Sequence, residues 1–392
     1  MQIKKNYDLI IAGAGAAGLS LMWYLLKSDK LKEREILLVD KSLKPNHDKT
    51  WCFWDDQYLP LNDIIHHTWN ELEVIAYGNS FNEKLKKYGY HCVRSSDYTI
   101  RMLEIARKQN NVEMLEAGIT GFSSIGETGI LHTDKGDFQA DWIFQSALKP
   151  SEFRDLKVDI SLKQHFLGIE IKTNRDLFNP DLVTLMDFDT DQKHGVTFFY
   201  ILPFSKNEAL IEYTFFTETV LSDEEYLEGI KNHLSEKYNL EENEYKITRR
   251  EKGVIPMEDR RYPAWYNNRV MNIGSMGGLT KPSTGYTFTR IHRHCAEIVS
   301  ELEKGNPPTA TGLSSYRFRV YDMMLLYLLK HEPETSVIIF HDLFENNSFE
   351  KVLTFLEEKT GIGTEISIFA SLPYLPFFKS IWKMKHRIFT GA

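Results

Sequence analysis

The apolar residues of this chain follow two different periods, and the change between them outlines the fold. Tyr7–Ala12 and Glu35–Asp40 are short apolar runs typical of buried parallel strands, and Leu19–Lys27 between them has helical character. Between Gln164 and Thr217, several runs alternate apolar and polar residues, as antiparallel strands do when one face is buried. The pattern therefore predicts an α/β unit combined with an antiparallel sheet.

The same patterns predict the elements of the remaining chain. A helix is expected over Tyr98–Lys108, and strands around Ile130–Thr133 and Phe138–Phe144. The antiparallel strands are predicted at His165–Lys172, Leu182–Phe188, Val196–Leu202 and Ala209–Phe216. Amphipathic helices are predicted at Leu313–Lys330, Glu334–Glu345, Asn347–Lys359 and Thr364–Leu372. We therefore expect an α/β unit over 1–160 and 250–310, a β-rich unit over 161–249 and a helical region over 311–392.

A glycine-rich turn joins the first predicted strand to the first helix. Its spacing is GxGxxG, and an acidic residue ends the next strand about twenty residues later, which completes a dinucleotide fingerprint. The three glycines permit a tight turn, close approach of a pyrophosphate and close packing of helix on strand. Contacts with an adenine dinucleotide are expected from Gly13, Gly15, Ala16, Ala17, Gly18, Asp40 and Lys41, with Asp40 bonding a ribose hydroxyl.

A second glycine-rich turn, Gly274–Phe288, follows another apolar run and precedes a helix-like segment. Two such turns far apart in the chain indicate one long ligand that is held at both ends. The regular βαβ order is broken by an aromatic segment, Asp48–Trp54, which we expect to be a loop. This interruption favours a Rossmann-like FAD domain over a simple NAD domain. The expected contacts at the flavin end are Gly274, Gly277, Pro282, Gly285 and Tyr286.

Glu212 is the strongest candidate for acid chemistry. Strand geometry places it on one face with Leu210, Thr214 and Phe216, where it is the only ionisable group. Burial without a cation raises the pKa of a carboxyl, so such a group holds a proton near neutral pH and can donate it. Three aromatic residues are expected to line the same space: Phe198, Phe199 and Tyr200. The alternative, a solvent-facing glutamate on an ordinary strand, remains open from the sequence.

Composition excludes several classes of protein. The net charge of −8 argues against a general nucleic-acid binder, and the three scattered cysteines are typical of free thiols. Leu9–Leu26 lacks charge, but its glycines favour a buried strand, turn and helix over a membrane span. Asp187–Asp191 imitates the opening of a calcium loop, yet Gln192 stands where that loop requires glycine. We therefore expect no metal site.

With both turns and Glu212 in view, the chain resembles the flavin-dependent lycopene cyclases of bacteria over nearly its whole length. The resemblance rests on short segments that occur in the family's order. They are Gly13–Gly18, Lys49–Trp54, Leu185–Phe188, Tyr200–Ser205, Ala209–Thr214, Gly253–Met257 and Pro282–Tyr286. The last segment is the most specific of them.

The resemblance implies an isomerase of carotenoid biosynthesis that closes the ψ-ends of lycopene into β-rings without net redox change. It implies reduced FAD, with NADPH or NADH as the external reductant. The family's essential glutamate matches Glu212, although Tyr213 replaces a second glutamate of the motif. Asp187 and Glu251 are weaker candidates for shaping the pocket or assisting proton transfer. Whether Glu212 or the flavin donates the proton is left open.

The segment Phe355–Thr360 matches the family's motif around its essential glutamate more literally than the segment around Glu212 does. We expect Asn347 to cap a helix there, and Glu357 and Glu358 to lie in solvent at its end. This second match is therefore not expected to be catalytic.

The C-terminal segment Pro376–Phe389 mixes aromatic and basic residues and contains no acid. That composition predicts shallow binding to an anionic membrane, so we expect a cytoplasmic protein bound peripherally to the inner face of the cell membrane. A disordered tail or a core-packing helix is the alternative. Rival functions are a related flavoprotein (geranylgeranyl reductase, hydroxylase or halogenase) and a non-catalytic flavin- or lipid-binding protein. Ser275 stands where hydroxylases usually carry aspartate, which weakens that rival.

Overall fold

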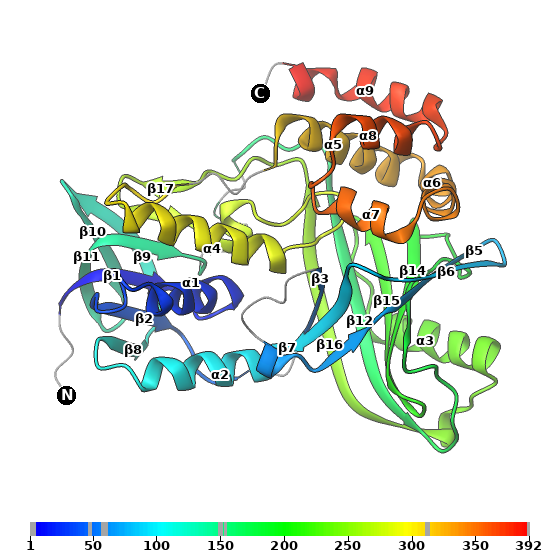
Figure 1. Cartoon of the computed structure of the whole chain (residues 1–392), viewed down its shortest axis with the longest axis horizontal. Helices are drawn as coiled ribbons and strands as arrows, with labels where there is room; N and C mark the ends of the chain where they lie inside the picture. Colours follow the sequence, from blue (N-terminus) through cyan, green and yellow to red (C-terminus); the bar gives the residue numbers. More distant parts are fainter. Residues whose placement is uncertain are drawn as a thin grey trace.

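A computed structural model of the chain describes residues 5–45, 49–55, 62–147, 152, 155–309 and 314–389. Two sheets form its two halves, and a layer of helices within residues 316–389 lies over one end of the seven-stranded sheet (Figure 1). Asp48 and Leu313, which begin two predicted elements, lie outside the described residues.

The first half is built on an eight-stranded sheet. Parallel pairing orders its central strands β18-β11-β1-β2-β8, with β17 at one edge and the β9–β10 hairpin attached to β11. The strands are β1 (Asn6–Ala12), β2 (Ile36–Asp40), β8 (Val112–Glu116), β9 (Ile119–Ile125), β10 (Thr128–Thr133), β11 (Gly136–Gln145), β17 (Trp265–Asn267) and β18 (Val270–Asn272). This arrangement confirms the Rossmann-like unit predicted from the N-terminal pattern.

Three helices cover one face of this sheet, and the β9–β10 hairpin covers the other (Figure 1). The helices are α1 (Ala16–Lys27), α2 (Ser95–Arg107) and α4 (Phe288–Glu303). The strands are buried on both faces, which is why they read as continuous apolar runs in the sequence.

The aromatic segment predicted as a loop is instead a strand. Thr50–Asp55 forms β3, which pairs antiparallel with β7 (Gly89–Arg94) in a three-stranded sheet completed by β4 (His67–Trp69). The prediction was wrong because aromatic residues are favoured in strands, where they pack against neighbouring strands. The neighbour here, β7, is distant in the sequence and becomes visible only in the structure. A short 3₁₀ turn, η1 (Asn62–Ile64), precedes β4.

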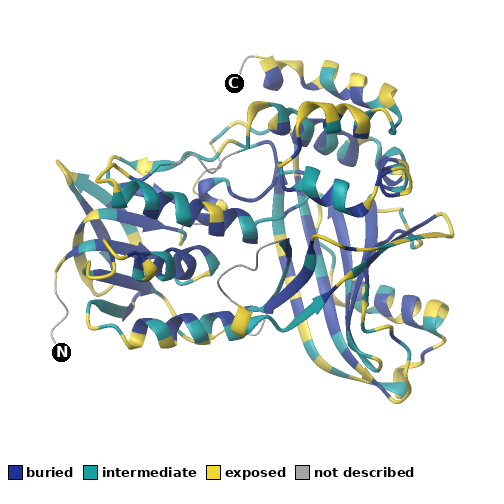
Figure 2. Cartoon of the chain, in the orientation of Figure 1, coloured by how far each residue is buried: buried dark blue, intermediate teal, exposed yellow. Residues whose placement is uncertain are grey.

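The second half is a seven-stranded sheet in the order β16-β12-β15-β14-β13-β5-β6. Its strands are β5 (Glu71–Ala76), β6 (Asn79–Lys84), β12 (Ser161–Thr173), β13 (Leu182–Asp187), β14 (Val196–Ser205), β15 (Glu208–Thr217) and β16 (Tyr245–Glu258). One face packs on α3 (Asp223–Tyr238), which is followed by η3 (Glu242–Glu244), and the other faces the cofactor-type unit and the C-terminal helices. Both faces are buried over most of their area (Figure 2).

This sheet extends beyond the predicted β-rich unit of 161–249. The hairpin β5–β6 comes from the N-terminal part of the chain, and β16 continues to Glu258. Strands from three separate stretches therefore meet in one sheet, which sequence periodicity alone does not encode.

The helical region predicted for the C-terminus is present. It consists of α5 (Tyr316–His331), α6 (Pro333–Glu345), α7 (Phe349–Leu356), α8 (Ile362–Phe369) and α9 (Tyr374–Phe389). The cap of α7 is Ser348, whose side chain accepts a hydrogen bond from the Lys351 amide, and not the predicted Asn347. Asn347 instead donates its side-chain amide to Leu343 and Ser371.

The outermost helix, α9, is fastened by a buried ion pair. Nε of Arg387 lies 2.6 Å from Oδ2 of Asp259, and both side chains are at most 2% exposed. The same carboxyl group accepts the backbone amide of Ile160. The end of β16 and the last turn of the chain are thereby joined.

We predict that Arg387→Met lowers the free energy of unfolding by about 3–5 kcal/mol, because it leaves the Asp259 carboxylate buried without its cation. Urea unfolding would measure the change. Lys383→Met on the exposed side of the same helix serves as the control and should change stability by less than about 0.5 kcal/mol. Equal effects of the two substitutions would show that the buried pair does not fasten α9.

Candidate active site

A cavity of about 330 Å³ lies where the two halves of the molecule meet. Its wall includes Ala16 at the start of α1 and Ser275 of η4 (Gly274–Gly277), so it reaches both glycine turns. On the opposite side it is lined by Glu212, Tyr200 and Gln164 of the seven-stranded sheet. The cavity therefore connects the expected cofactor region with the candidate acid.

The first glycine turn has the geometry that its spacing predicts. Gly13 has φ +113°, and a Cβ there would lie 2.4 Å from Oγ of Ser146. A Cβ at Gly18 would lie 1.9 Å from the carbonyl oxygen of Gly13, so only glycine lets helix and strand approach so closely. A Cβ at Gly15, by contrast, would meet nothing within 4 Å. Open space at the N-terminus of α1 is what an incoming phosphate group requires.

Asp40 and Lys41 follow the strand next to this turn. The Asp40 carboxylate accepts the backbone amides of Ala14 at 2.7 Å and Ser42 at 3.1 Å, so it holds the turn in place. Lys41 is exposed. The contact of Asp40 with a ribose hydroxyl stays a prediction.

The second glycine turn touches the first. Gly274 has φ +66°, and a Cβ there would lie 2.9 Å from the Cβ of Ala17. A Cβ at Gly277 would lie 2.5 Å from the carbonyl oxygen of Asn272. The two turns predicted to hold one ligand at both ends thus lie side by side across the first turn of α1.

The turn continues into a hairpin-like loop that borders the cavity. The amide of Gly285 donates to the carbonyl of Lys281 at 2.8 Å, and the amide of Lys281 donates to the carbonyl of Tyr286 at 3.0 Å. Gly285 has φ +73°, and a Cβ there would lie 2.2 Å from Oε1 of Gln164. Pro282 is half-buried within this loop.

The polar atoms of the cavity wall fit a cofactor with hydrogen-bonding edges. Oε1 of Gln164 and Oγ1 of Thr284 are buried and find no hydrogen-bond partner in the part of the chain that the structure describes, and both residues line the cavity. Buried polar groups are normally paired. Together with the open space beside Gly15, these atoms fit a dinucleotide: Gly15 would receive its phosphates, and Gln164 and Thr284 would offer hydrogen bonds to its polar groups.

A second, apolar cavity of about 70 Å³ adjoins the first. Thr284 and Tyr286 line both cavities. Lys281, Ser283 and Leu372 add to its wall, and the remainder comes from β13 and from helices α5 to α9, including Phe340, Phe369 and Phe377. The Tyr286 side chain therefore stands between the Glu212 cavity and an aromatic space beneath the C-terminal helices.

Glu212 lies on the face of β15 predicted for it. Leu210 and Phe216 pack into the core on that side, whereas Ile211 and Phe215 pack against α3 on the other. Glu212 is half-buried and lines the cavity, which excludes the alternative of a solvent-facing glutamate on an ordinary strand.

The sequence suggested that Glu212 is the only ionisable group on this face of the sheet. That prediction was wrong, because Glu251 of β16 lies beside Glu212. Glu251 is 3% exposed and is bonded through Oε2 to Nη1 of Arg249 at 2.6 Å and to Oγ1 of Thr50 at 2.7 Å. Arg249 also binds Glu170, with Nε 3.1 Å from Oε2. Glu212 in the cavity wall is thus backed by a second carboxyl group, which is bound to Arg249.

The environment favours the protonated form of Glu212. Burial raises the pKa of this carboxyl well above its ordinary value, and the charge of Glu251 and a hydrogen bond to it raise the pKa further. Arg249 opposes the shift. Glu212 can therefore hold a proton near neutral pH, as a general acid must.

Asp187, the second sequence candidate, lies elsewhere. It is fully buried against α3, where it forms an ion pair with Lys237, and His233 Nε2 is 3.9 Å away. Burial raises the pKa of Asp187, and Lys237 lowers it. Asp187 is not among the described residues that line the Glu212 cavity, so this structure separates it from the candidate acid.

The prediction for the aromatic residues of β14 was partly wrong. Tyr200 lines the cavity beside Glu212, but Phe198 packs in the core against Phe188 and Phe216. Phe199 stacks on Tyr213 and on His233 of α3. Strand alternation accounts for Phe199, because neighbouring residues point to opposite faces. Phe198 shares the face of Tyr200 but lies one step farther from the cavity.

Glu357 is buried and Glu358 is half-buried, contrary to the prediction that they lie in solvent. Glu357 is 7% exposed and pairs with Arg293, and Glu358 pairs with Lys281 at 2.9 Å and Arg290 at 3.0 Å. The pair therefore ties the end of α7 to the second glycine turn. It does not line the Glu212 cavity.

Sequence analysis missed Gly168 and Arg249, which surround the acidic pair. A lone glycine within an apolar strand signals close approach of neighbouring groups, so Gly168 was detectable in principle. Arg249 carries no local signal, because it is one of several charged residues on an alternating strand.

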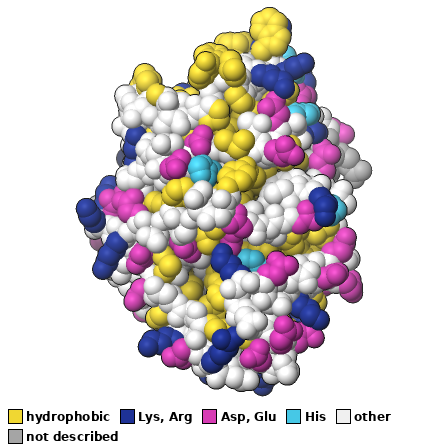
Figure 3. Space-filling view, turned by 90° about the vertical axis from the view of Figure 1, so that its right-hand side faces the viewer, with side chains coloured by type: hydrophobic (Ala, Val, Ile, Leu, Met, Phe, Trp, Pro, Cys, Tyr) yellow, Lys and Arg dark blue, Asp and Glu magenta, His cyan; other side chains and the backbone are white. Residues whose placement is uncertain are grey.

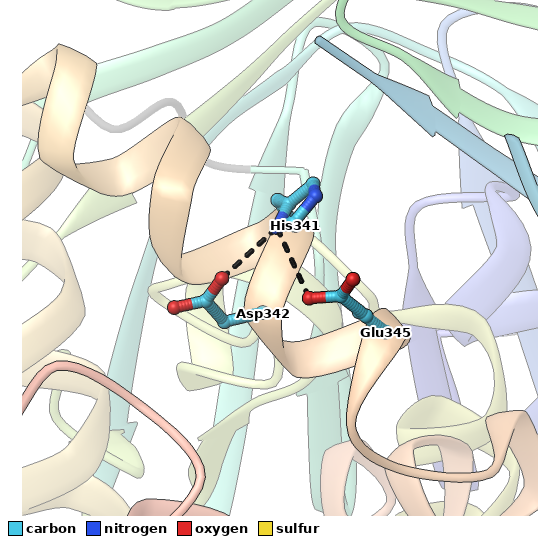
Figure 4. A group of neighbouring side chains, drawn as sticks. All are labelled: His341, Asp342 and Glu345. Atoms are coloured by element: carbon cyan, nitrogen blue, oxygen red, sulfur yellow. Dashed lines mark hydrogen bonds and ion pairs between the residues drawn. The ribbon is translucent and has the colours of Figure 1, made fainter. Parts of the chain in front are cut away.

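Among the described residues, one group of side chains lies close enough together to bind a metal ion. It is on α6 and consists of His341, Asp342 and Glu345 (Figure 4). Nδ1 of His341 lies 2.9 Å from Asp342 and 3.8 Å from Glu345. The His341 ring also contacts Tyr77 and Phe81 of the β5–β6 hairpin. These contacts give the group a role in packing the hairpin on α6.

Comparisons with known proteins identify the family of the chain. The family model described as lycopene cyclase protein matches residues 8–381. The lycopene β-cyclase of Paracoccus sp. is 26% identical to this chain over 79% of this chain and 76% of its own length. The lycopene β-cyclase of Pantoea ananas is 24% identical over 73% of this chain and 72% of its own length.

The solved structure of an HpxO variant from Klebsiella pneumoniae in complex with FAD has a TM-score of 0.58 at 13% identity, covering 94% of this chain and 99% of that one. This likeness concerns the fold, which is that of FAD-binding hydroxylases and reductases. The match of the family model runs through both glycine turns and the acidic pair. The chain therefore belongs to the lycopene cyclase family.

Proposed function

We propose that this protein is a lycopene β-cyclase, an isomerase that closes the ψ-ends of a linear carotene into β-rings by acid catalysis. The observation that carries the proposal is the position of Glu212. A carboxyl with a raised pKa lines a cavity that reaches both dinucleotide-type turns and adjoins an aromatic space. An acid at the border of a cofactor region and an apolar region suits a proton transfer to a hydrocarbon.

FAD is the proposed cofactor, in its reduced form, with NADPH or NADH as the external reductant. Gly13, Gly15 and Gly18 would receive the pyrophosphate, and the turn from Gly274 to Tyr286 would border the flavin ring. When reduced and anionic, the flavin supplies negative charge that stabilises a nearby carbocation in a water-poor site.

In the proposed reaction, Glu212 donates its proton to C2 of the terminal double bond, which leaves a cation at C1. The C5–C6 double bond then attacks C1, the ring closes, and loss of a proton from C6 gives the β-ring. The faces of Tyr200 and Tyr286, which line the cavity, can stabilise the cation. Aromatic and apolar walls keep water from trapping it.

The apolar cavity beneath α5–α9 is the proposed site for the rest of the polyene. Ligands of drug size occupy roughly 300–1,000 Å³, and the cavity of about 70 Å³ is smaller. A carotene therefore requires the aromatic side chains or the helices around this cavity to move apart.

We also propose that α9 places the protein on the inner face of the cell membrane. None of the described helices is long and apolar enough to span a bilayer. One side of α9 packs on α5 through Phe377, Met384 and Ile388. The other side exposes large hydrophobic residues and lysines: Tyr374, Leu375, Phe378, Trp382, Phe389, Lys379, Lys383 and Lys385.

This mixture reaches the surface at the top of the molecule, where hydrophobic side chains lie beside basic ones (Figure 3). It suits shallow insertion into anionic lipid. It also places the proposed polyene cavity next to the lipid from which a carotene is taken.

Glu212→Gln is expected to lower cyclisation by at least about 100-fold, because an amide cannot donate the proton. The measurement is the conversion of lycopene with pre-reduced FAD and anaerobic product analysis. Glu208→Gln on the same strand, whose carboxylate pairs with Lys172 at the surface, should retain activity. Wild-type turnover in Glu212→Gln would overturn the role of Glu212, and hydroxylated or reduced products would favour the rival flavoproteins.

Phe378→Ser combined with Trp382→Ser is expected to weaken binding to anionic vesicles by at least about tenfold, since each aromatic contributes roughly 1.5–3 kcal/mol when buried. Vesicle flotation would measure the change, and rising salt should weaken wild-type binding further. Ile125→Ser, at a distant exposed position, is the control. If the double variant floats as well as wild type, α9 is not the membrane surface.

A further inference from the structure

The position of Gly168 explains how two carboxyl groups come together at the end of the cavity. Strand β12 runs between β15 and β16, and Gly168 lies directly opposite Glu212 on one side and Glu251 on the other. A Cβ at this position would lie 2.7 Å from Cγ of Glu212 and 3.1 Å from Cγ of Glu251. The two side chains therefore lean toward each other over a residue that has no side chain.

Glu251 is held as the charged member of this pair. Arg249 and Thr50 both bind its Oε2 atom, and Nη2 of Arg249 also donates to Oγ1 of Thr50 at 2.7 Å. Its other oxygen, Oε1, is buried and has no donor from these groups. Two carboxyl groups can bond to each other only when one of them carries a proton.

The two acids differ in their access to the cavity. Glu212 lines it, whereas Glu251 is 3% exposed and is not among the described residues of its wall. A proton shared by the pair can therefore reach a polyene only from Glu212. Glu251 can act on the reaction only through Glu212.

We propose that Glu251 is a positioning residue that keeps the transferable proton on Glu212, and that Gly168 is required to bring the two carboxyl groups into contact. The proposal rests on the cyclase function proposed above. During the reaction the O–H bond of Glu212 breaks and a C–H bond forms at C2. The resulting Glu212 carboxylate then lies beside the Glu251 carboxylate, and their repulsion favours recapture of the proton that leaves C6. One proton leaves the pair and one returns, which matches an isomerisation.

Other titratable groups that face Glu212 do not replace Glu251 in this role. The hydroxyl of Tyr200 on β14, the thiol of Cys52 on β3 and the Tyr286 hydroxyl beside Tyr200 are neutral near pH 7, and burial raises the pKa of each of them. Among the described residues, Arg249 is the one cation that acts on Glu212, and it also binds Glu251 and Glu170. Within the same part of the chain, Glu251 is the negative charge that acts on Glu212 through both its charge and a hydrogen bond.

The test is the pH dependence of cyclisation in Glu251→Gln. Removing the negative neighbour lowers the pKa of Glu212, so the alkaline limb of the rate profile should move to lower pH by about one unit or more. At a pH on this limb kcat should fall by about tenfold while KM changes little. Glu258→Gln is the matched control, because Glu258 is also buried on β16 and paired with an arginine, but is remote from Glu212. Its profile should coincide with that of wild type.

An infrared titration of the protonated carboxyl band gives a second readout that does not require turnover. The band is assigned to Glu212 by its loss in Glu212→Gln, and it should disappear at lower pH in Glu251→Gln than in wild type. Gly168→Ala, if it folds, should shift the band in the same direction. An unchanged band and an unchanged profile in Glu251→Gln would overturn the inference while leaving the cyclase proposal intact. If wild type does not cyclise carotenes, the cyclase proposal fails and the infrared titration alone decides whether the pair shares a proton.

Discussion

Two carboxyl groups in contact within a buried site cannot both be ionised, because the repulsion between them is weakly screened there. The arrangement around Glu212 follows from this constraint. Glu251 holds the nearest cation, with Arg249 Nη1 at 2.6 Å, and Thr50 binds the same oxygen. Glu212, whose carboxyl pKa is raised by burial and by Glu251, is the member of the pair that faces the cavity. Because strand register places both groups across Gly168, the chemistry of the site depends on how β12, β15 and β16 align.

The loop from Lys281 to Tyr286 joins the parts of the molecule that such a reaction needs. Lys281 is 4% exposed and pairs with Asp322 of α5 at 2.8 Å and with Glu358 after α7 at 2.9 Å. Tyr286 at the end of the loop lines both the Glu212 cavity and the apolar one. Buried ion pairs add little net stability, but losing one partner is costly, so they hold one geometry. The helical layer is thereby tied to the cofactor-type turn, and a shift of either would move Tyr286.

Most elements were predictable because their signals are local. The strand, glycine turn and helix at the N-terminus, the four antiparallel strands of the middle region and the C-terminal helices all appear near their predicted positions. The face of β15 that carries Glu212 was also predicted, since side chains alternate along a strand. The wrong predictions concern residues whose neighbours in the structure come from distant parts of the chain. Residues 50–55 form a strand because β7 pairs with them. Glu357 and Glu358 are withdrawn from solvent because Lys281, Arg290 and Arg293 form ion pairs with them.

The sequence by itself determined the two glycine turns, the periodicity of the strands and the choice of Glu212 as the candidate acid, because each is set by residues close together in the chain. Only the tertiary structure decided which groups surround that acid. Gly168, Thr50 and Arg249 come from three strands, and Glu251 is 39 positions from Glu212 by their numbering. Asp187, which the sequence placed near the reaction, was separated from it by the sheet itself. Burial and charge neighbours depend on packing between distant segments, and the protonation state of a carboxyl depends on both.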